Sequence, residues 1–585
     1  MIEKFSFLKF IWKLVLQRPW HYAGGILSVI ILDAVDMIPS LLIKEVTDKA
    51  QKSPEELNML PYAGALVACY LVISLLRLGW RFLIIIPART IECELRQKSF
   101  DKILASDFVQ VSQLKTGDVV STLSQDLNNI RMFMGPAILV SFDSLAYFIF
   151  IPATLFYILG WGALWVLLPF TLLMFAVMFV HKPLEEAFGA VSNTLGDLSQ
   201  YVADESQGAR FFRAEGLIEI RRRRYEILLK GLLGRQLDIS KWELVLDGSL
   251  QFVIQTSYLT VLILAWQGQG SMAQGLGALT VSLQLLDKLI WPLMSISYLM
   301  SLYQQARTGA RRLHEIEKLP TKVQGPEHLN SSLNRIEISD LSTKSIEGKK
   351  LLQGITLTAK RGEHIALVGG VGSGKTVLLQ TLAGLWEKDY LDYSRFKFNE
   401  VSFEQLNRIS LAKQLSFIPQ TPQIFSQSLG MNISPNFPLI PNTLWASLEK
   451  ADLSADIQLF PEGLGTIVGE KGLNLSGGQK QRTLIARSFH SKAKLYLWDD
   501  AISALDPVTE KRIISNLKNL DPEAILILAT HRLSSLKNFD RILVMEEGRI
   551  IQSGSFDDIK RNHALFASLL RDEQENLAKE AVWTP

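Results

Sequence analysis

The chain has 585 residues, a length at which two or more domains are expected rather than one hydrophobic core. Hydrophobic residues make up 48% of the chain and the mean hydropathy is +0.17, which is unusual for a soluble enzyme of this size. The net charge of +3 gives no argument for nucleic-acid binding. The two cysteines, Cys69 and Cys93, form no CxxC or Cys/His cluster and support neither a disulfide scaffold nor a zinc site.

Residues 1–20 are predicted to form an interfacial helix, because basic and aromatic side chains alternate along them. A basic segment before an apolar run could also be a signal peptide. The run that follows, however, is long, contains Asp33 and Asp36, and has no small-residue cleavage site. We therefore expect a helix at the cytoplasmic membrane surface with its aromatic side chains in the boundary.

Residues 21–312 are predicted to form a membrane domain with six spans, each of about the 20 residues that cross a bilayer. The spans are approximately Tyr22–Ile43, Leu60–Ile86, Met134–Leu159, Trp161–Val180, Leu246–Trp266 and Leu276–Leu302. The third and fourth are separated only by Gly160 and should form a tight hairpin. An even number of spans places both ends of the domain on one side of the membrane.

Charge indicates that this side is the cytoplasm. The segments between spans two and three and between spans four and five are long and basic, and the latter contains Arg221–Arg224. The outer loops at Gly160 and Gln267–Gly275 lack Lys and Arg, although the first outer loop holds Lys49 and Lys52. This distribution fits the positive-inside rule. The arginine run is interpreted as a cytoplasmic helix face, with an anionic partner as the alternative.

Several ionisable residues lie within the apolar spans, where a charge is costly unless it faces a cavity or a partner. They are Asp33, Asp36, Arg77, Arg81, Asp143, Asp287 and Lys288. A substrate pathway lined by Asp36 and Asp143 would suit cationic amphiphiles. The alternative is that these residues lie near helix ends or pair with other helices.

Residues 313–334 are predicted to be a linker, broken by Pro320, Gly325 and Pro326, and residues 335–585 a second domain. This domain contains the pattern GxxxxGK[ST] of a phosphate-binding loop. Its residues are Gly369, Gly370, Val371, Gly372, Ser373, Gly374, Lys375 and Thr376. The loop follows the apolar run His364–Val368 and precedes a helical run, which is the strand–loop–helix order that the chemistry needs. The glycines turn N–H groups toward phosphate, Lys375 reaches the outer phosphates, and Thr376 supplies an oxygen for Mg²⁺.

A second motif, LSGGQ, opens an amphipathic run and is followed by the apolar stretch Leu495–Asp499, which is predicted to be a buried strand that ends in a carboxylate. The motif consists of Leu475, Ser476, Gly477, Gly478 and Gln479. Glycines at a helix start let backbone N–H groups approach an anion.

On these motifs the second domain resembles the nucleotide-binding domain of an ABC transporter, and the whole chain resembles one half of an ABC exporter. The resemblance implies an α-helical six-span membrane domain followed by an α/β P-loop ATPase domain, with ATP and Mg²⁺ bound. It implies Gln420 and His531 as the Q-loop and switch residues, and Thr376, Gln420 and Asp499 as the Mg²⁺ site. The D-loop would be Ser503, Ala504, Leu505 and Asp506. Thr116–Asp118 and residues 205–210 match the family's pattern near the cytoplasmic contacts with the ATPase domains.

Two departures from the family concern one ATP site. The family places a glutamate directly after the Walker B aspartate, which corresponds to Asp499 here, and this glutamate polarises the attacking water. This chain has Asp500 at that position. The family also stacks an aromatic residue on adenine near Ser345, and no aromatic residue occurs between Arg335 and Glu363. Asp500 could still serve through a relayed water.

In this family each ATP lies between the phosphate-binding (Walker A) loop of one half, here Gly369–Thr376, and the LSGGQ signature motif of the other half. In this chain the residues beside the Walker A loop depart from the family pattern, whereas Leu475–Gln479 match it. This asymmetry resembles the bacterial heterodimeric multidrug exporters, in which one site hydrolyses slowly. The resemblance implies ATP-driven efflux of amphipathic small molecules, lipids or peptides across a bacterial inner (plasma) membrane, with a second half as partner and the ATPase domain in the cytoplasm. The alternatives are a homodimeric lipid or peptide exporter, and an ATP-gated channel or regulator on the same scaffold.

Overall fold

A computed structural model of the chain describes residues 6–267, 276–322, 324–435, 440–469 and 472–562. The chain divides into two compact units. The helical unit contains residues 1–101 and 116–317, and the α/β unit contains residues 102–115 and 318–585.

Six helical stretches of the described residues are long and apolar enough to cross a membrane, as expected from the sequence. They are Pro19–Lys52, Met59–Ala105, Thr116–Leu159, Gly162–Val180, Ile218–Trp266 and Leu276–Glu317. The helices of this unit that are used below are α1 (Phe7–Val15), α2 (Pro19–Val35), α3 (Met37–Lys52), α4 (Met59–Trp80), α5 (Ile86–Ala105), α7 (Thr116–Ser121), α9 (Ile138–Leu159), α10 (Gly162–Ala214), α11 (Ile218–Trp266), α12 (Leu276–Lys288) and α13 (Ile290–Glu317).

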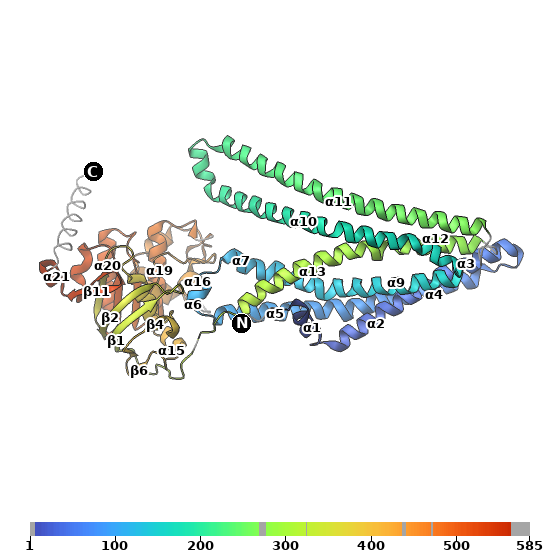
Figure 1. Cartoon of the computed structure of the whole chain (residues 1–585). Coiled ribbons are helices and arrows are strands. Elements are labelled where there is room, and N and C mark those ends of the chain that lie inside the picture. The colour runs from blue at the N-terminus through green and yellow to red at the C-terminus, as the bar shows by residue number, and fades with distance from the viewer. Residues whose placement is uncertain (1–5, 268–275, 323, 436–439, 470–471, 563–585) are drawn as a thin grey trace. The chain divides into compact units, whose positions relative to one another are not determined.

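The two longest helices extend well past a bilayer. Helix α10 has 53 residues and α11 has 49, and they run side by side as an antiparallel hairpin (Figure 1). At about 1.5 Å per residue each exceeds 70 Å, whereas the hydrocarbon core is about 30 Å thick. Near the turn between them, Arg221 pairs with Glu205 and lies over the ring of Tyr201. Arg222 and Arg223 form i,i+4 pairs with glutamates of the same helix, which supports the interpretation of the arginine run as a helix face.

Helix α1 differs in part from the interfacial helix expected for residues 1–20. The ring of Phe7 is buried and lies 5.2 Å from that of Phe133 and 5.3 Å from that of Tyr303. Trp12 and Trp20 are exposed. The expectation that the aromatic side chains lie in the membrane boundary is therefore wrong for Phe7, because its ring completes an aromatic cluster inside the helical unit.

The short helix α6 (Phe108–Val111) belongs to the α/β unit. The backbone N–H of Asp107 donates to the carbonyl of Pro320 at 3.0 Å, and the amide of Gln110 donates to the hydroxyl of Tyr390 at 3.1 Å. This segment ends immediately before Thr116–Asp118, the stretch that the sequence associated with a cytoplasmic contact.

The α/β unit is built on two sheets. Five of the strands of the larger one are parallel, with the order β10-β3-β9-β8-β7, and β11 pairs antiparallel with β10. These strands are β3 (His364–Val368), β7 (Leu415–Ile418), β8 (Leu495–Asp499), β9 (Ile525–Ala529), β10 (Arg541–Glu546) and β11 (Arg549–Gly554). The smaller sheet is antiparallel and contains β1 (Arg335–Lys344), β2 (Lys350–Lys360), β4 (Leu391–Asp392), β5 (Arg395–Phe398) and β6 (Val401–Ser402). The unit with six candidate membrane spans, followed by an α/β unit, confirms the expected fold class.

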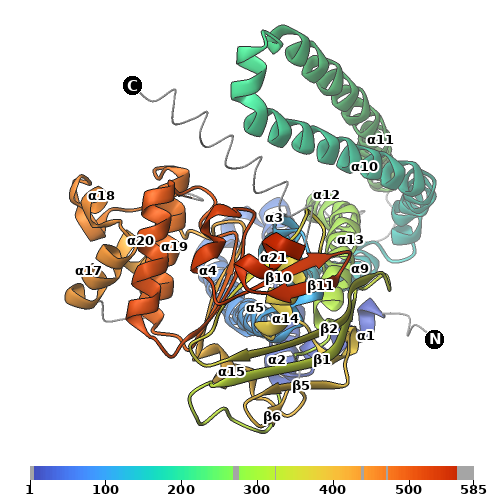
Figure 2. The ribbon, with the colours of Figure 1, turned by 90° about the vertical axis from the view of Figure 1, so that its left-hand side faces the viewer.

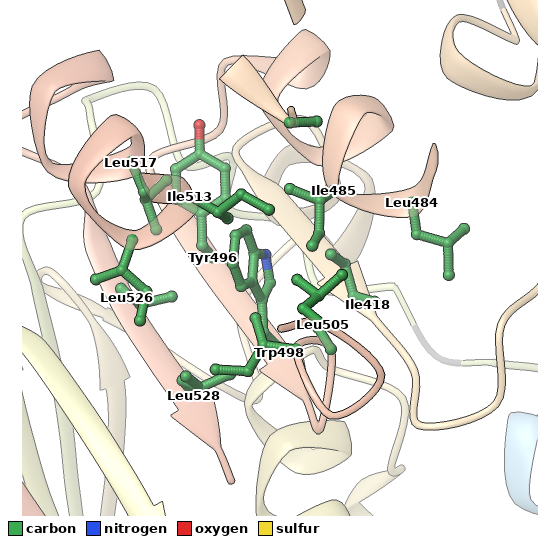
Figure 3. Packing of buried hydrophobic residues seen from close by; sticks show 14 of the residues in the cluster. Ile418, Leu484, Ile485, Tyr496, Trp498, Leu505, Ile513, Leu517, Leu526 and Leu528 are labelled. Atoms are coloured by element: carbon green, nitrogen blue, oxygen red, sulfur yellow. The ribbon is translucent and has the colours of Figure 1, made fainter. Parts of the chain in front are cut away.

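Strand β8 connects the two hydrophobic cores of this unit, because alternate side chains of a strand point to opposite faces. Leu495 and Leu497 belong to one core, and Tyr496 and Trp498 to the other, which the helices α19 (Gly477–Ser491) and α20 (Pro507–Leu520) cover (Figure 3). The indole N–H of Trp498 donates to the hydroxyl of Ser488 at 3.0 Å. Helices α19 and α20 lie on one side of the unit, together with α17 (Pro441–Lys450) and α18 (Ser454–Gln458), and the strands β1, β2 and β5 on another (Figure 2).

Candidate nucleotide site and signature helix

The loop between β3 and α14 (Lys375–Leu382) has the backbone of a phosphate cradle. Gly372 and Gly374 have φ values of +80° and +99°, which glycine adopts without strain. A Cβ on Gly369 would lie 2.2 Å from the carbonyl oxygen of Met545, so only glycine fits there. A Cβ on Gly370 would meet nothing within 4 Å, and Val371 is almost fully exposed. The loop is therefore packed on its inner side and open on its outer side, where a phosphate would approach.

Lys375 lies at the centre of this loop. Its ammonium group donates to the carbonyl oxygens of Gly369 at 2.8 Å and Gly370 at 3.0 Å, and to the hydroxyl of Ser373 at 3.3 Å. Burial lowers the pKa of Lys375, and the carboxylates of Asp499 and Asp500 act in the opposite direction. The charge is thus held by the same backbone that would surround a phosphate.

The residues at the end of β8 fit a hard cation such as Mg²⁺. Asp499 is 3% exposed, and its Oδ2 has no hydrogen-bond partner among the described residues. Burial raises the pKa of Asp499, while a hydrogen bond with the Thr376 side chain lowers it. A buried carboxylate oxygen without a partner, next to a hydroxyl, is the oxygen donor set that Mg²⁺ prefers when it also binds phosphate.

Asp500 has a left-handed backbone, with φ of +53°. Asp and Asn adopt this region more readily than most other non-glycine residues. Its backbone N–H donates to the carbonyl of Ala529 at 2.9 Å, and its carbonyl accepts from the hydroxyl of Ser503 at 2.9 Å. Because the backbone is fixed on both sides, the reach of this carboxylate is set by the length of its side chain.

Gln420 and His531 lie at the same edge of the sheet. Gln420 comes two residues after β7 and His531 two residues after β9, and both are exposed. Strands β3, β9, β8 and β7 are parallel neighbours, so their carboxyl ends, with the phosphate loop, Asp499 and Asp500, face one edge.

The LSGGQ motif begins α19, and Ser476 is its N-cap. The hydroxyl of Ser476 accepts from the N–H of Gln479 at 3.3 Å, and the Gln479 side chain accepts from the N–H of Ser476 at 3.0 Å. This capping box fixes the first turn. Ser476 and Gly477 are exposed, and a Cβ on Gly477 would meet nothing within 4 Å. The helix thus presents a hydroxyl and free N–H groups at its positive end, while Leu475 is buried beneath it.

The D-loop is attached to this helix by Gln481, which the sequence did not single out. The amide group of Gln481 donates to the hydroxyl of Ser503 at 2.9 Å and accepts from the N–H of Ala504 at 2.8 Å. Leu505 is buried, and Asp506 caps α20 by accepting from the N–H of Thr509 at 3.0 Å, which lowers the pKa of Asp506. A polar residue on the buried face of an amphipathic helix is the signal that could have identified Gln481.

Ser345, where the family would stack adenine, lies in the turn between β1 and β2. Its N–H donates to the carbonyl of Lys349 at 2.8 Å. The start of β2 lies close to the phosphate loop, since a Cβ on Gly374 would lie 2.8 Å from Leu352. The turn is thus near the loop but has only aliphatic and polar side chains to offer a base.

In the helical unit the two proposed pathway carboxylates have partners on other helices. Asp36 accepts from Lys288 at 2.6 Å and from the hydroxyl of Tyr147 at 3.2 Å. Asp143 accepts from the indole N–H of Trp291 at 3.1 Å. Pairing between helices, the alternative considered from the sequence, therefore applies to Asp36, whereas Asp143 has a neutral donor.

Comparisons with known proteins agree with this geometry. The ABC transporter family model matches residues 352–503, and the ABC transporter transmembrane region model matches residues 23–307. The multidrug resistance-like ATP-binding protein MdlA of Buchnera aphidicola is 24% identical, covering 94% of this chain and 96% of the relative. A probable multidrug resistance ABC transporter ATP-binding/permease protein of Bacillus subtilis is 25% identical, covering 96% of each. An ATP-dependent lipid A-core flippase of Aromatoleum aromaticum is 28% identical over 80% of this chain and 77% of the relative.

Among solved structures, a bacterial Atm1-family ABC exporter with ATP bound has a similar fold. The TM-score is 0.74 at 19% identity, with 95% of this chain and 98% of the other covered. This likeness concerns the fold of the chain.

Proposed function

Because this chain belongs to the ABC transporter family and carries both its ATP-binding and its transmembrane region, we propose that it is one half of a heterodimeric exporter of amphipathic compounds, with a slow ATP site of its own. The protein is a multi-pass membrane protein with a cytoplasmic ATPase domain, and its ATPase activity is coupled to transport.

Residues of this chain have different roles at the ATP site formed by its own phosphate loop. Lys375 and the N–H groups of the phosphate loop bind the phosphates, and Thr376 and Asp499, with Gln420, hold Mg²⁺. Mg²⁺ held by these residues would supply positive charge that neutralises the charge developing on the outer phosphates. Asp500 orients the attacking water, and His531 lies at the same edge to contact the outer phosphate.

The proposal that this site hydrolyses ATP slowly rests on the backbone conformation of Asp500. A fixed left-handed backbone leaves the carboxylate one C–C bond short of a glutamate, and no change of main-chain conformation is free to compensate. A misplacement of about 1 Å can cost about 100-fold in rate. The site therefore binds ATP with a complete phosphate cradle and turns it over slowly.

The signature helix of the same chain is undamaged. Ser476 and the glycines after it are exposed at the start of a well-capped helix, where they can complete the site of a second chain. Because the Walker motifs of this chain are weakened and its LSGGQ motif is complete, the chain suits a partner with complete Walker motifs and a weakened LSGGQ motif. We infer a partner with a glutamate after its Walker B aspartate.

The exported compounds are inferred from the relatives only by class. Relatives of this chain are described as multidrug resistance proteins, a lactococcin transport protein and lipid A-core flippases. For this chain we propose an amphipathic small molecule, lipid or peptide as the cargo.

A homodimeric exporter is the second candidate: the phosphate cradle and Asp499 are complete in this chain, and in a homodimer Asp500 would serve through a relayed water. The test is to measure ATP hydrolysis by the full chain in liposomes, alone and together with the chain that co-purifies from its native membrane. The proposal predicts slow hydrolysis alone and substrate-stimulated hydrolysis with the partner. Fast, substrate-stimulated hydrolysis by the chain alone would establish the homodimer.

A further inference from the structure

The outer end of α3 carries three lysines, Lys44, Lys49 and Lys52, on the side of the membrane where the positive-inside rule expects few. Together with Leu41 of the same helix and Tyr157 of α9 they line a hollow of about 620 Å³. The hollow lies within the helical unit, at the end where α3, α4 and α12 meet (Figure 1). Neither the nucleotide site nor the proposed cargo pathway uses these residues.

Two acids also line the hollow, and the first of them, Asp48, is held by two helices. One of its carboxylate oxygens accepts from the ammonium group of Lys44 at 3.0 Å, and the other accepts from the N–H of Gly277, at the start of α12, at 2.9 Å. A Cβ on Gly277 would lie 2.4 Å from the carbonyl oxygen of Lys44, so α12 begins directly against this turn of α3. Both oxygens of Asp48 are therefore occupied.

The second acid, Glu45, accepts from Lys49 at 2.7 Å and from the hydroxyl of Tyr62, on α4, at 2.8 Å. Lys52 is exposed, and its ammonium group pairs with no residue that the structure describes. The lining thus has three lysines against two acids, and each acid already has two donors. One positive charge of the hollow is left without a counter-charge.

The depth of these lysines corresponds to the headgroup layer of a bilayer. The first apolar stretch ends at Ile43, directly before Lys44. Lys49 is five residues further along the helix, or about 7.5 Å, and the headgroup layer is about 5–7 Å thick on each side of the hydrocarbon core. Tyr157 lies two residues before the end of α9, where tyrosine is typical of the membrane boundary. The residues nearest to the hollow in the membrane are therefore lipid headgroups.

We propose that this hollow binds the phosphate of one monoanionic phospholipid of the outer leaflet, of the phosphatidylglycerol type, through Lys44, Lys49 and Lys52. The one positive charge without a counter-charge matches a headgroup with a single negative charge. A zwitterionic headgroup would bring its own ammonium group next to the three lysines. The lipid bridges α3 and α9 at this end and is not cargo. The assignment needs only that the chain spans a membrane, so it goes beyond the proposed export function and does not depend on it.

The test uses the full chain, with any chain that co-purifies with it, in nanodiscs of phosphatidylcholine that contain increasing fractions of phosphatidylglycerol. Hydrogen–deuterium exchange of the backbone over residues 44–57 reports binding at the hollow. Exchange should slow as the fraction of phosphatidylglycerol rises, because a bound headgroup stabilises the closed form of this helix end. The same fractions of phosphatidylethanolamine, which is zwitterionic, should leave the exchange unchanged.

Lys52→Gln removes the ammonium group without a partner and leaves both acids with their donors. A lysine near the membrane surface contributes about a factor of five to the binding of an anionic lipid, so the fraction of phosphatidylglycerol that gives half of the protection should rise by about fivefold. Lys230→Gln is the matched control, because Lys230 is an exposed lysine of α11 outside its apolar stretch. This variant should behave as the wild type.

Equal protection of the wild type by phosphatidylglycerol and phosphatidylethanolamine, or an unchanged lipid dependence in Lys52→Gln, would overturn the site. Faster exchange of Lys52→Gln by the same factor in every lipid mixture would also overturn it, since that result is expected if the lysine only stabilises the carboxyl end of α3. Protection by soluble glycerol phosphate in pure phosphatidylcholine would overturn the lipid as the occupant. Absence of ATP-driven uptake of an amphiphile into inverted vesicles, with lipid protection intact, would overturn the proposed function alone.

Discussion

The N–H of Ala504 in the D-loop donates to Oε1 of Gln481 on the signature helix, at a distance of 2.8 Å. The same side chain donates to the hydroxyl of Ser503 at 2.9 Å, and that hydroxyl in turn donates to the carbonyl of Asp500. One amide group therefore links the start of α19 with the loop that follows Asp499 and Asp500. A movement of α19 should be transmitted to Asp500 through this link.

Replacing Gln481 by methionine should loosen the D-loop, because methionine keeps the volume of the side chain and removes its hydrogen bonds. Each lost bond contributes about 0.5–1.5 kcal/mol. The amide of Ala504 should exchange its hydrogen faster, by about tenfold for 1.4 kcal/mol, as measured by hydrogen–deuterium exchange. Gln458→Met, at an exposed position at the end of α18, is the matched control. Unchanged exchange at Ala504 would show that other contacts hold the loop.

Lys375→Ala should weaken ATP binding to this half by about 10- to 100-fold, since a hydrogen bond to a charged group contributes about 1.5–3 kcal/mol. The affinity is measured with a labelled nucleotide analogue that is not hydrolysed. Lys413→Ala removes an exposed lysine of the same unit and should leave the affinity unchanged. Equal affinity of the Lys375→Ala variant and the wild type would defeat the assignment of the phosphate loop.

Metal binding at this site should weaken with falling pH sooner than at an exposed carboxylate. Burial raises the pKa of Asp499 above the ordinary value, so in the folded protein its carboxylate takes up a proton at a higher pH. A cation requires the ionised form, and its affinity should fall tenfold per pH unit below that pKa. Mn²⁺ binding in the presence of a non-hydrolysable ATP analogue, followed by electron paramagnetic resonance, measures this. Asp499→Asn should bind more weakly, with a pH dependence that comes from the nucleotide alone; the same profile in both proteins would argue against Asp499 as a ligand.

Ser345→Tyr should give this half a surface on which adenine can stack. An aromatic contact of this kind contributes about 0.5–1.5 kcal/mol, so ATP should bind about two- to tenfold more tightly. Inorganic triphosphate, which has no base, is the control ligand, and its affinity should not change. If ATP gains nothing over triphosphate, the base is held by a group outside this turn.

Two strands of the nucleotide site were predictable because one apolar run directly precedes the phosphate loop and another ends at Asp499. The apolar runs His364–Val368 and Leu495–Asp499 are β3 and β8, and the groups that follow them meet because parallel neighbours have their carboxyl ends on one side. The six spans were likewise predictable, since length and apolarity are properties of the sequence itself. Helices α10 and α11 continue past the apolar stretches as polar helices without a break.

What the sequence could not predict are pairings between distant elements. Gln481 and Ala504 meet because α19 packs beside the loop after β8, and Asp36 meets Lys288 although the two are 252 residues apart in the sequence. The backbone of Asp500 is also a consequence of its surroundings, namely the hydrogen bonds with Ala529 and Ser503. Phe7 was misplaced for the same reason, because its aromatic partners lie more than a hundred residues away.

The division of labour between the two ATP sites is tested most directly by two substitutions in this chain, Asp500→Asn and Ser476→Ala, each measured as the substrate-stimulated ATPase rate of the intact complex with its partner. Asp500→Asn removes the charge at the slow site and should change the rate by less than about twofold, because that site contributes little turnover. Ser476→Ala removes a hydroxyl that completes the partner's site and should lower the rate by about tenfold or more. A complex in which Asp500→Asn abolishes hydrolysis would contradict the account.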